Sequence, residues 1–179
     1  ESSRLEGTPS MMLVSGTTSP RAAQWIQESE SAHIAVVRLW SLASPSQAAK
    51  CARWEDGTEP CCRALREKGR VVLCLGSPPH SGEVDRPSSP GLPLLAALAM
   101  RVLERCQPRW VLAEGGATAA ALLDRLPWVW WRVLREWAPG VVELRPPGLP
   151  APALLVKPGS YPWPETVRDL WFGGGKPGP

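Results

Sequence analysis

The chain has 179 residues, of which 44% are hydrophobic, and a formal net charge of +3. This length and composition fit one globular domain with a core of its own, and so small a charge gives no argument for nucleic-acid binding. No apolar run approaches the roughly 20 residues that span a bilayer, so no membrane segment is expected.

The cysteine pattern argues against a metal site and for reduced thiols. The five cysteines form no Cys-x-x-Cys pair, and only two histidines accompany them, so a zinc site is not predicted. An odd number of cysteines is typical of free thiols, which predicts a cytoplasmic protein. We interpret the adjacent Cys61 and Cys62 as half-buried helix packing, with a redox or metal role as the lesser alternative.

The first elements alternate between strand and helix. Residues 11–14 form an apolar run that predicts a strand. Ser19 and Pro20 then have the residue types of a helix cap and a first helical position, and residues 22–30 continue that helix. Residues 34–39 predict a second strand, which we expect to be parallel and buried because it alternates little.

The next segment contains a predicted break and a long loop. Residues 45–68 are rich in helix formers but carry Asp56-Gly57, which predicts two helices or a helix and a turn. Residues 71–75 predict a third strand. Residues 78–93 carry five prolines and predict a loop that acts as a lid, and residues 94–106 predict an amphipathic helix.

The central stretch of the chain joins a buried strand to a helix through two glycines. Residues 110–113 are apolar and predict the strand. Gly115 and Gly116 permit a sharp turn, after which Thr118 offers a hydroxyl cap to a helix over residues 119–126. A glycine turn that leads into a helix start is a place where backbone N–H groups can bind an anion. The alternative is a tight turn with no ligand.

The last third changes in character. Residues 128–137 hold four of the ten tryptophans and favour a strand over a helix. After a turn at residues 139–140, residues 141–144 and 153–159 predict two further strands. Residues 164–172 predict a short helix.

These elements together predict an α/β fold. We expect a single three-layer domain with a mainly parallel sheet and an irregular or antiparallel C-terminal third. The domain should span residues 11–172. Residues 1–10 are expected to be disordered or foreign to it, and residues 173–179 to form a flexible tail.

Several strands end in turns that carry glycine or a hydroxyl, and in a parallel sheet such ends gather on one edge, where ligands bind. The candidate binding residues are Ser15, Gly16, Thr17, Gly115, Gly116, Ala117, Thr118, Gly140, Lys157 and Gly159.

Several side chains can be interpreted individually, some of them in two ways. Lys157 either neutralises a phosphate or is a solvated edge-strand lysine, and in both cases we expect it to be exposed enough for its substitution to leave stability unchanged. Glu114 either helps to hold Mg²⁺ or caps the turn. His33 is interpreted as a satisfied core residue and His80 as a solvated loop residue. The tryptophans of residues 128–137 are either a base-stacking platform or, the favoured alternative, core or interface packing.

Four ordered blocks resemble the C-terminal nucleotide-binding domain of the four-carbon acid sugar kinase family. They are LVSGTTSPRAAQ (13–24), LAEGGATAAAL (112–122), APG (138–140) and LLVKPGSY (154–161). The resemblance carried by these ordered blocks extends over residues 11–170, which is nearly the whole chain.

The resemblance implies an ATP site at residues 15–17, 115–118 and 159, with Lys157 nearby, in a kinase that phosphorylates a hydroxyl of a small sugar acid with ATP and Mg²⁺. It also implies a substrate domain or subunit supplied in trans, or a homo-oligomer. The family's GGDT carboxylate is Ala117 here and its FG is Tyr161-Pro162, which puts metal handling and catalysis in doubt more than nucleotide binding. The sequence names no catalytic base. The alternatives are a non-catalytic nucleotide or anion-binding protein and a Trp-rich interaction module.

Overall fold

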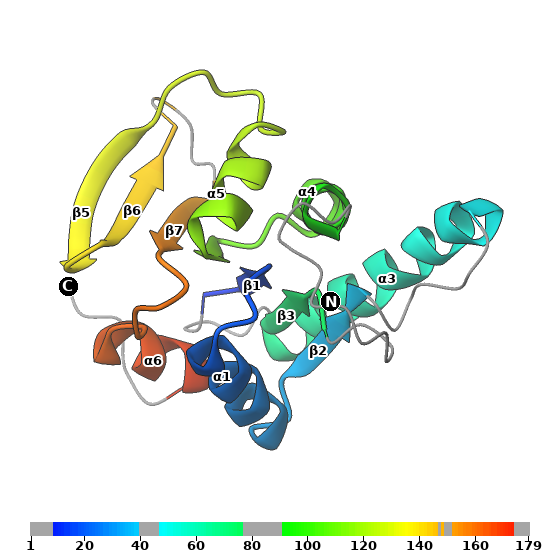
Figure 1. The fold of residues 1–179 in the computed structure, drawn as a ribbon, viewed down its shortest axis with the longest axis horizontal. Helices are drawn as coiled ribbons and strands as arrows, with labels where there is room; N and C mark the ends of the chain where they lie inside the picture. Colours follow the sequence, from blue (N-terminus) through cyan, green and yellow to red (C-terminus); the bar gives the residue numbers. More distant parts are fainter. Residues whose placement is uncertain (1–8, 40–46, 77–90, 147, 149–151, 174–179) are drawn as a thin grey trace, which may run out of the picture.

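The computed structural model describes residues 9–39, 47–76, 91–146, 148 and 152–173, and for residues 47–56 it describes the backbone alone. The elements follow one another along the chain as shown in Figure 1. In order they are β1 (Met11–Ser15), α1 (Pro20–Ser31), β2 (Ala35–Arg38), α3 (Gln47–Lys68), β3 (Arg70–Cys74), α4 (Gly91–Cys106), β4 (Trp110–Glu114), α5 (Gly116–Leu123), β5 (Arg132–Ala138), β6 (Val141–Arg145), β7 (Ala153–Lys157) and α6 (Glu165–Phe172).

The strands form one seven-stranded sheet in the order β2-β3-β1-β4-β7-β6-β5. The first five strands of this order pair in parallel, whereas β6 pairs antiparallel with both β7 and β5. The predicted mainly parallel sheet with an antiparallel C-terminal part is therefore confirmed.

Helices cover both faces of the sheet, which gives the three predicted layers. One face packs against α3, α4 and α5, through side chains such as Leu65, Leu98 and Leu122. The other face packs against α1 and α6, and Figure 1 shows these two helices together on the side opposite α4 and α5. Because β1 and β4 are covered on both faces, every one of their residues is buried, as expected for the middle of a parallel sheet.

Tryptophans dominate the core on the α1 and α6 side. Trp25 of α1 packs against Trp163 and Trp171, with ring centroids 6.2 and 6.4 Å away. The indole nitrogen of Trp171 donates a buried hydrogen bond to the Ser29 hydroxyl at 3.0 Å, so the ring is both packed and satisfied. The favoured packing role is confirmed for Trp137, which meets Trp110 edge-on at 5.3 Å.

The start of α1 is formed as predicted. Ser19 is the N-cap and its side chain accepts a hydrogen bond from the backbone N–H of Ala22, with Pro20 at the first helical position.

Two predicted element boundaries are wrong. Residues 47–68 form one continuous helix instead of two helices or a helix and a turn, although Gly57 and Pro60 lie inside it. Burial of Cys61, Cys62 and Leu65 against the sheet and α4 offsets the local cost of these residues. The helix after β4 begins at Gly116 with Gly115 as N-cap and has no side-chain cap, so Thr118 lies within the first turn and is not the cap.

β2 and the histidine before it differ from the expectation. β2 is parallel as predicted, but it lies at the sheet edge and is only half-buried. His33 is exposed and is not a core residue. It lies in the turn before the strand and has a left-handed backbone conformation, with φ 57°. Its carbonyl accepts a hydrogen bond from Lys68 Nζ at 2.8 Å.

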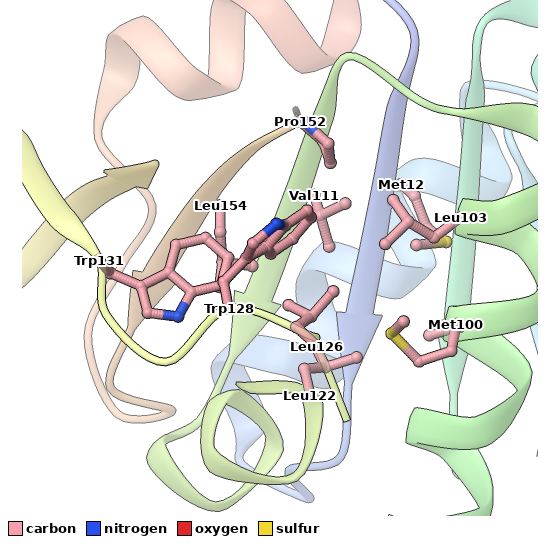
Figure 2. Close-up of a pocket in the computed structure, with 11 residues that line it drawn as sticks. Met12, Met100, Leu103, Val111, Leu122, Leu126, Trp128, Trp131, Pro152 and Leu154 are labelled. Carbon is pink, nitrogen blue, oxygen red and sulfur yellow. The ribbon is translucent and has the colours of Figure 1, made fainter. Parts of the chain in front are cut away.

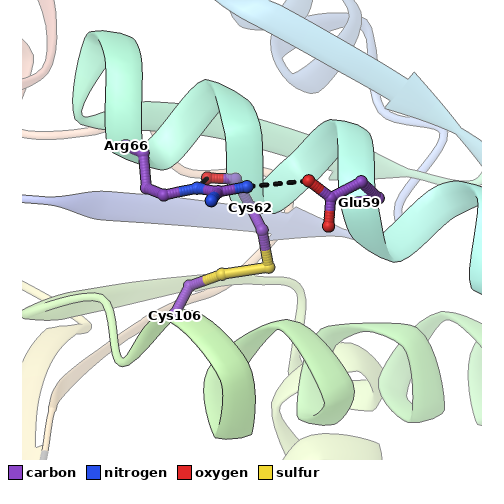
Figure 3. The surroundings of a disulfide bond; sticks show 4 residues. All are labelled: Glu59, Cys62, Arg66 and Cys106. Carbon is purple, nitrogen blue, oxygen red and sulfur yellow. Dashed lines mark hydrogen bonds and ion pairs between the residues drawn. A yellow bond between two sulfur atoms is a disulfide. The ribbon is translucent and has the colours of Figure 1, made fainter.

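A disulfide overturns the expectation of reduced thiols for two of the cysteines. Cys62 of α3 bonds to Cys106 at the end of α4, with Cα atoms 5.7 Å apart (Figure 3). Cys61 and Cys74 are free and buried. The prediction that Cys61 and Cys62 are half-buried is wrong, because both are fully buried. Burial raises the pKa of the Cys61 thiol to about 12, so it stays protonated and unreactive near neutral pH.

Other predictions fall outside the described residues. These concern most of the 78–93 loop, His80, and most of residues 1–10 and 173–179. Ser10 is described, and its backbone carbonyl accepts a hydrogen bond from Trp110 N–H at 3.0 Å, so it is ordered against the sheet. No helix in the described part of the chain is long and apolar enough to cross a membrane.

Candidate functional site

The carboxyl ends of three adjacent parallel strands meet at one place. Ser15, Glu114 and Lys157 are the last residues of β1, β4 and β7. The strand register places Ser15 beside Glu114 and Glu114 beside Lys157. The turns that carry most of the predicted binding residues leave the sheet directly after these three.

These three side chains form a buried polar chain. The Ser15 hydroxyl donates to Glu114 Oε2 at 2.8 Å, and Lys157 Nζ lies 2.6 Å from Glu114 Oε1. Each of the three is 1% exposed. Buried charges are tolerated when they are paired and hydrogen-bonded, and here both carboxylate oxygens are engaged. Glu114 thus joins strand ends and does not cap the turn.

Lys157 is enclosed by protein. Its ammonium also donates to the Pro158 carbonyl at 3.1 Å and lies 5.1 Å from the centre of the Trp163 ring. The expectation of an exposed lysine at the strand end is wrong, because Glu114 and Trp163 cover it. The solvated alternative fails for the same reason, and direct neutralisation of a phosphate stays a prediction.

The first glycine turn is tied to the second through Thr118. The backbone N–H of Gly16 donates to Thr118 Oγ1 at 3.1 Å. A Cβ on Gly16 would lie 2.6 Å from that oxygen and 2.2 Å from Leu92, so no side chain fits there. Thr118, which is 3% exposed, holds the β1 turn against the start of α5.

The third turn is tied to the first through Ser19 and Thr17. The Ser19 hydroxyl donates to the Gly159 carbonyl at 2.8 Å. A Cβ on Gly159 would lie 2.8 Å from Thr17 Oγ1, so glycine is required for this close approach. The 15–17, 115–118 and 157–159 segments therefore lie together, as expected. That they line one ligand-binding cleft stays a prediction.

The start of α5 opens toward solvent at this convergence. Gly115 has φ 99°, which favours glycine, and its N–H donates to the Lys157 carbonyl. Gly116 and Ala117 follow and are exposed. The first N–H groups of a helix have no intrahelical acceptor, and in α5 no side chain caps them. They lie at the positive end of the helix dipole.

Gly140 lies beside the third turn through Tyr161. It occupies the β5–β6 turn with φ 76°, and a Cβ there would lie 3.0 Å from the Tyr161 ring and 3.7 Å from Pro158. Its N–H donates to Glu136 Oε1. These contacts place Gly140 against the turn after β7, so it supports that turn.

The described residues offer no protein-held metal site. They include no group of three or more His, Cys, Asp or Glu side chains that could hold a metal ion. Both oxygens of Glu114 are already bound to Lys157 and Ser15, and Ala117 has no ligand atom. A Mg²⁺ ion coordinated by the side chains of this site therefore does not fit.

An apolar cavity lies elsewhere in the described part of the chain. It measures about 20 Å³ and is lined near the amino ends of the strands by Met12, Val111 and Leu154. Figure 2 shows Trp128 and Trp131 on one side of it and Met100 and Leu103 of α4 on the other. The two indole rings meet edge-on at 5.3 Å, which fits a packing role for them. The cavity is separate from the polar convergence at the carboxyl ends.

Comparison with known proteins gives a match at the level of fold. No family model and no curated protein matches the sequence. A DUF1537 protein from Haemophilus influenzae superposes with a TM-score of 0.69 at 17% identity, over 94% of this chain and 42% of that one. The chain has the fold of DUF1537 proteins.

Two further structures agree with this match. A DUF1537 protein from Bordetella bronchiseptica, a domain-swapped dimer with bound citrate, has a TM-score of 0.65 at 20% identity, over 93% of this chain and 41% of that one. A Salmonella typhimurium protein, provisionally named a tRNA synthase, has 0.66 at 15%, over 95% and 40%. DUF1537 proteins are members of the four-carbon acid sugar kinase family. The chain spans about two fifths of the length of these proteins.

Sequence reasoning missed the partners inside the site. It named Lys157 and Glu114 separately but not their ion pair, and it assigned Ser19 only a capping role, although its hydroxyl also binds Gly159. One signal was available: Ser15, Glu114 and Lys157 each stand where an apolar run ends, and parallel neighbours end together.

Proposed function

We propose that this chain is the ATP-binding domain of a small-molecule kinase, a transferase of carbohydrate metabolism that phosphorylates a hydroxyl of a four-carbon acid sugar. Residues outside this 179-residue sequence, in the same polypeptide or in a separate subunit, would supply the substrate domain. The shared fold with DUF1537 proteins, which are slightly more than twice as long, supports a substrate domain that is separate from this one.

The observation that carries the proposal is the uncapped, exposed start of α5. Gly116 and Ala117 present backbone N–H groups at the positive end of a helix, where phosphate oxygens bind well. The exposed Thr18 and the half-buried Thr17 lie in the neighbouring turn and can add hydroxyl donors. A phosphate chain would thus be bound mainly by backbone groups.

In this proposal the role of Lys157 is to position the strand ends from which the turns of the site leave. Its ammonium holds Glu114, and Glu114 holds Ser15, so the pair fixes the three strand ends from which the turns leave. Its carbonyl also accepts the N–H of Gly115, which sets the direction of the α5 start. The positive charge still adds to the field at the site, although Glu114 largely cancels it.

Mg²⁺ enters the proposal only with the nucleotide. Since the side chains of this site do not fit a metal ion, we infer that the ion would arrive bound to the phosphates of ATP. No catalytic step is derived from it.

A second candidate is a non-catalytic nucleotide or anion-binding protein. The exposed residue Ala117 favours it, because the position beside the helix start has no carboxylate that could act on metal or substrate. Both candidates need the same binding site, and they differ only in turnover once a substrate domain is present.

Replacement of Gly116 tests the site directly. Gly116 is the first residue of α5, a position where proline is tolerated, so Gly116→Pro removes one N–H donor while the helix can still form. The loss of one charge-assisted hydrogen bond, worth about 1.5–3 kcal/mol, should weaken ATP binding by about tenfold to a hundredfold in calorimetric titration.

The matched control is Gly116→Ala, which keeps the N–H and meets no atom within 4 Å. It should bind ATP as the wild type does. Adenosine affinity should be equal in all three proteins, since adenosine lacks phosphate. Citrate should compete only if the site binds anions in general. Absence of ATP binding by the wild type at millimolar concentration would remove the proposal.

A further inference from the structure

Arg21 is a cation in the first turn of α1, beside the candidate site. Ser19 is the N-cap of α1, so a rise of about 1.5 Å per residue places Arg21 only about 3 Å along the helix axis from the cap. The Ser19 hydroxyl donates to the Gly159 carbonyl, and a Cβ on Gly115 would lie 3.6 Å from Thr17 Cβ. The start of α1 therefore belongs to the same convergence as the start of α5.

The faces of α1 indicate where Arg21 lies relative to the turn after β7. Arg21 and Glu28 are seven positions apart and so share one side of the helix. Glu28 pairs with Arg168 of α6 at 2.7 Å, which shows that this side faces α6, and Figure 1 shows α6 beside α1. Helical side chains tilt toward the N-terminus of their helix. The Arg21 side chain is therefore directed toward the carboxyl edge of the sheet, on the side of the turn that carries Gly159.

The charge of Arg21 is not neutralised by any residue that the structure describes. Arg21 is exposed, and within the described residues no acidic side chain pairs with it. Two other cations end strands of the parallel sheet, and both are paired: Lys157 with Glu114, and Arg38 with Glu30 at 2.6 Å. Of these three cations, only Arg21 can neutralise a ligand without first breaking an ion pair.

Local stability does not account for an arginine at this position. The positive end of a helix dipole favours acidic residues in the first turn and disfavours basic ones, yet α1 has no acidic residue there. The residues three and four positions after Arg21 are Gln24 and Trp25, so no ion pair along the helix compensates. A residue that opposes the local preference without such compensation is typical of a functional position.

We propose that Arg21 binds one phosphate of the nucleotide while the start of α5 binds another, an inference that rests on the proposed function. The two helices pack on opposite faces of the sheet, and their starts come together at its carboxyl edge. A chain of linked phosphates, unlike a single phosphate, could contact both starts. The planar guanidinium of arginine can donate to two phosphate oxygens at once, so Arg21 supplies the charge that Lys157, held by Glu114, does not.

Calorimetric titration with ATP and with adenosine tests the role of Arg21. Arg21→Gln should weaken ATP binding by about tenfold and leave adenosine binding unchanged, because only ATP presents phosphate. Arg21→Lys should restore part of the affinity, since lysine keeps the charge but lacks the planar fork. In Arg21→Gln/Gly116→Pro the two losses should multiply, because the two groups bind different phosphates. The melting temperature of Arg21→Gln should stay unchanged or rise slightly, since a cation leaves the first turn of a helix.

The matched control is Arg125→Gln, which removes the same charge from an exposed arginine just beyond the C-terminal end of α5. It should bind ATP as the wild type does. Unchanged ATP affinity in Arg21→Gln, when Gly116→Pro weakens it, would overturn this inference and leave the proposed function standing. Weaker binding of citrate with unchanged binding of ATP would also overturn it, since Arg21 would then bind a carboxylate. A wild type that binds no ATP would remove the proposed function and this inference together.

Discussion

Lys157 and Glu114 form a buried ion pair beneath the candidate site, with Nζ and Oε1 2.6 Å apart and both side chains 1% exposed. Their strands, β4 and β7, are neighbours, and the register sets the two residues side by side. The pair thus connects the turn that starts α5 to the turn that carries Gly159. Removing either charge should affect both the fold and the site.

Replacing Lys157 alone should be strongly destabilising. Lys157→Met leaves the Glu114 carboxylate buried without its cation, which costs about 3–5 kcal/mol in comparable pairs. The double variant Lys157→Met/Glu114→Gln removes both charges and should recover most of that loss. Urea unfolding measures both. Wild-type stability in Lys157→Met would contradict the ion pair as described.

The same two variants separate a positioning role of Lys157 from a direct contact with phosphate. If Lys157 acts through Glu114, the double variant should regain ATP affinity together with stability. If its ammonium contacts phosphate, the double variant should stay weak for ATP while binding adenosine normally. Calorimetry with both ligands decides between these outcomes and depends on the wild type binding ATP at all.

Substitution of Gly159 should distort the site from the side of Thr17. The new Cβ of Gly159→Ala would lie 2.8 Å from Thr17 Oγ1 and 3.2 Å from its Cβ, and such overpacking costs about 1–3 kcal/mol. Thermal unfolding should show the loss, and Thr17→Ala in the same chain should relieve it. Gly116→Ala is the matched control and should be neutral or stabilising by up to about 1 kcal/mol. An unchanged melting temperature for Gly159→Ala would contradict the close approach.

Thr118 should matter for its hydroxyl more than for its bulk. Thr118→Val keeps the shape but removes the acceptor for the Gly16 N–H, and an unsatisfied buried donor costs about 1–3 kcal/mol. Faster amide exchange at Gly16 by NMR is the expected signature. Thr18→Val, at an exposed position in the same turn, should change neither stability nor exchange.

The Cys62–Cys106 disulfide should contribute measurably to stability. The two residues are 44 positions apart, and closing a loop of that length is worth about 4 kcal/mol in the chain-entropy model. Peptide mapping without reductant should recover the linked pair, and Cys106→Ser should lower the unfolding midpoint in urea. Cys61 should resist alkylation until the protein unfolds, since burial raises its pKa to about 12. Recovery of unlinked Cys62 and Cys106 peptides from protein kept free of reductant would be the contrary result.

Most helices and strands could be predicted because they are determined by residues close together in the sequence. The apolar runs that became β1, β3, β4 and β7 are buried in the parallel part of the sheet, and such strands stand out in sequence. The cap at Ser19 also depends only on its neighbours. For the same reason the sequence placed the turns of the site at a common edge.

Features that depend on tertiary contacts could not be predicted in this way. The order of strands decides that β2 is a half-buried edge, and the register of β4 and β7 decides that Lys157 meets Glu114. The continuity of α3 through Gly57 and Pro60 depends on burial against α4. None of these follows from periodicity, because each concerns residues far apart in the chain.

The contacts that close the site span almost the whole chain, and this has a consequence during synthesis. The bonds Ser15–Glu114, Gly16–Thr118 and Ser19–Gly159 join residues 99, 102 and 140 positions apart. Contacts of such long range form late in folding. A nascent chain on the ribosome therefore cannot assemble the site until residue 159 has left the exit tunnel. Ligand capture by this domain would accordingly have to follow the synthesis of residue 159, and a ligand could not act as a template for the earlier strands.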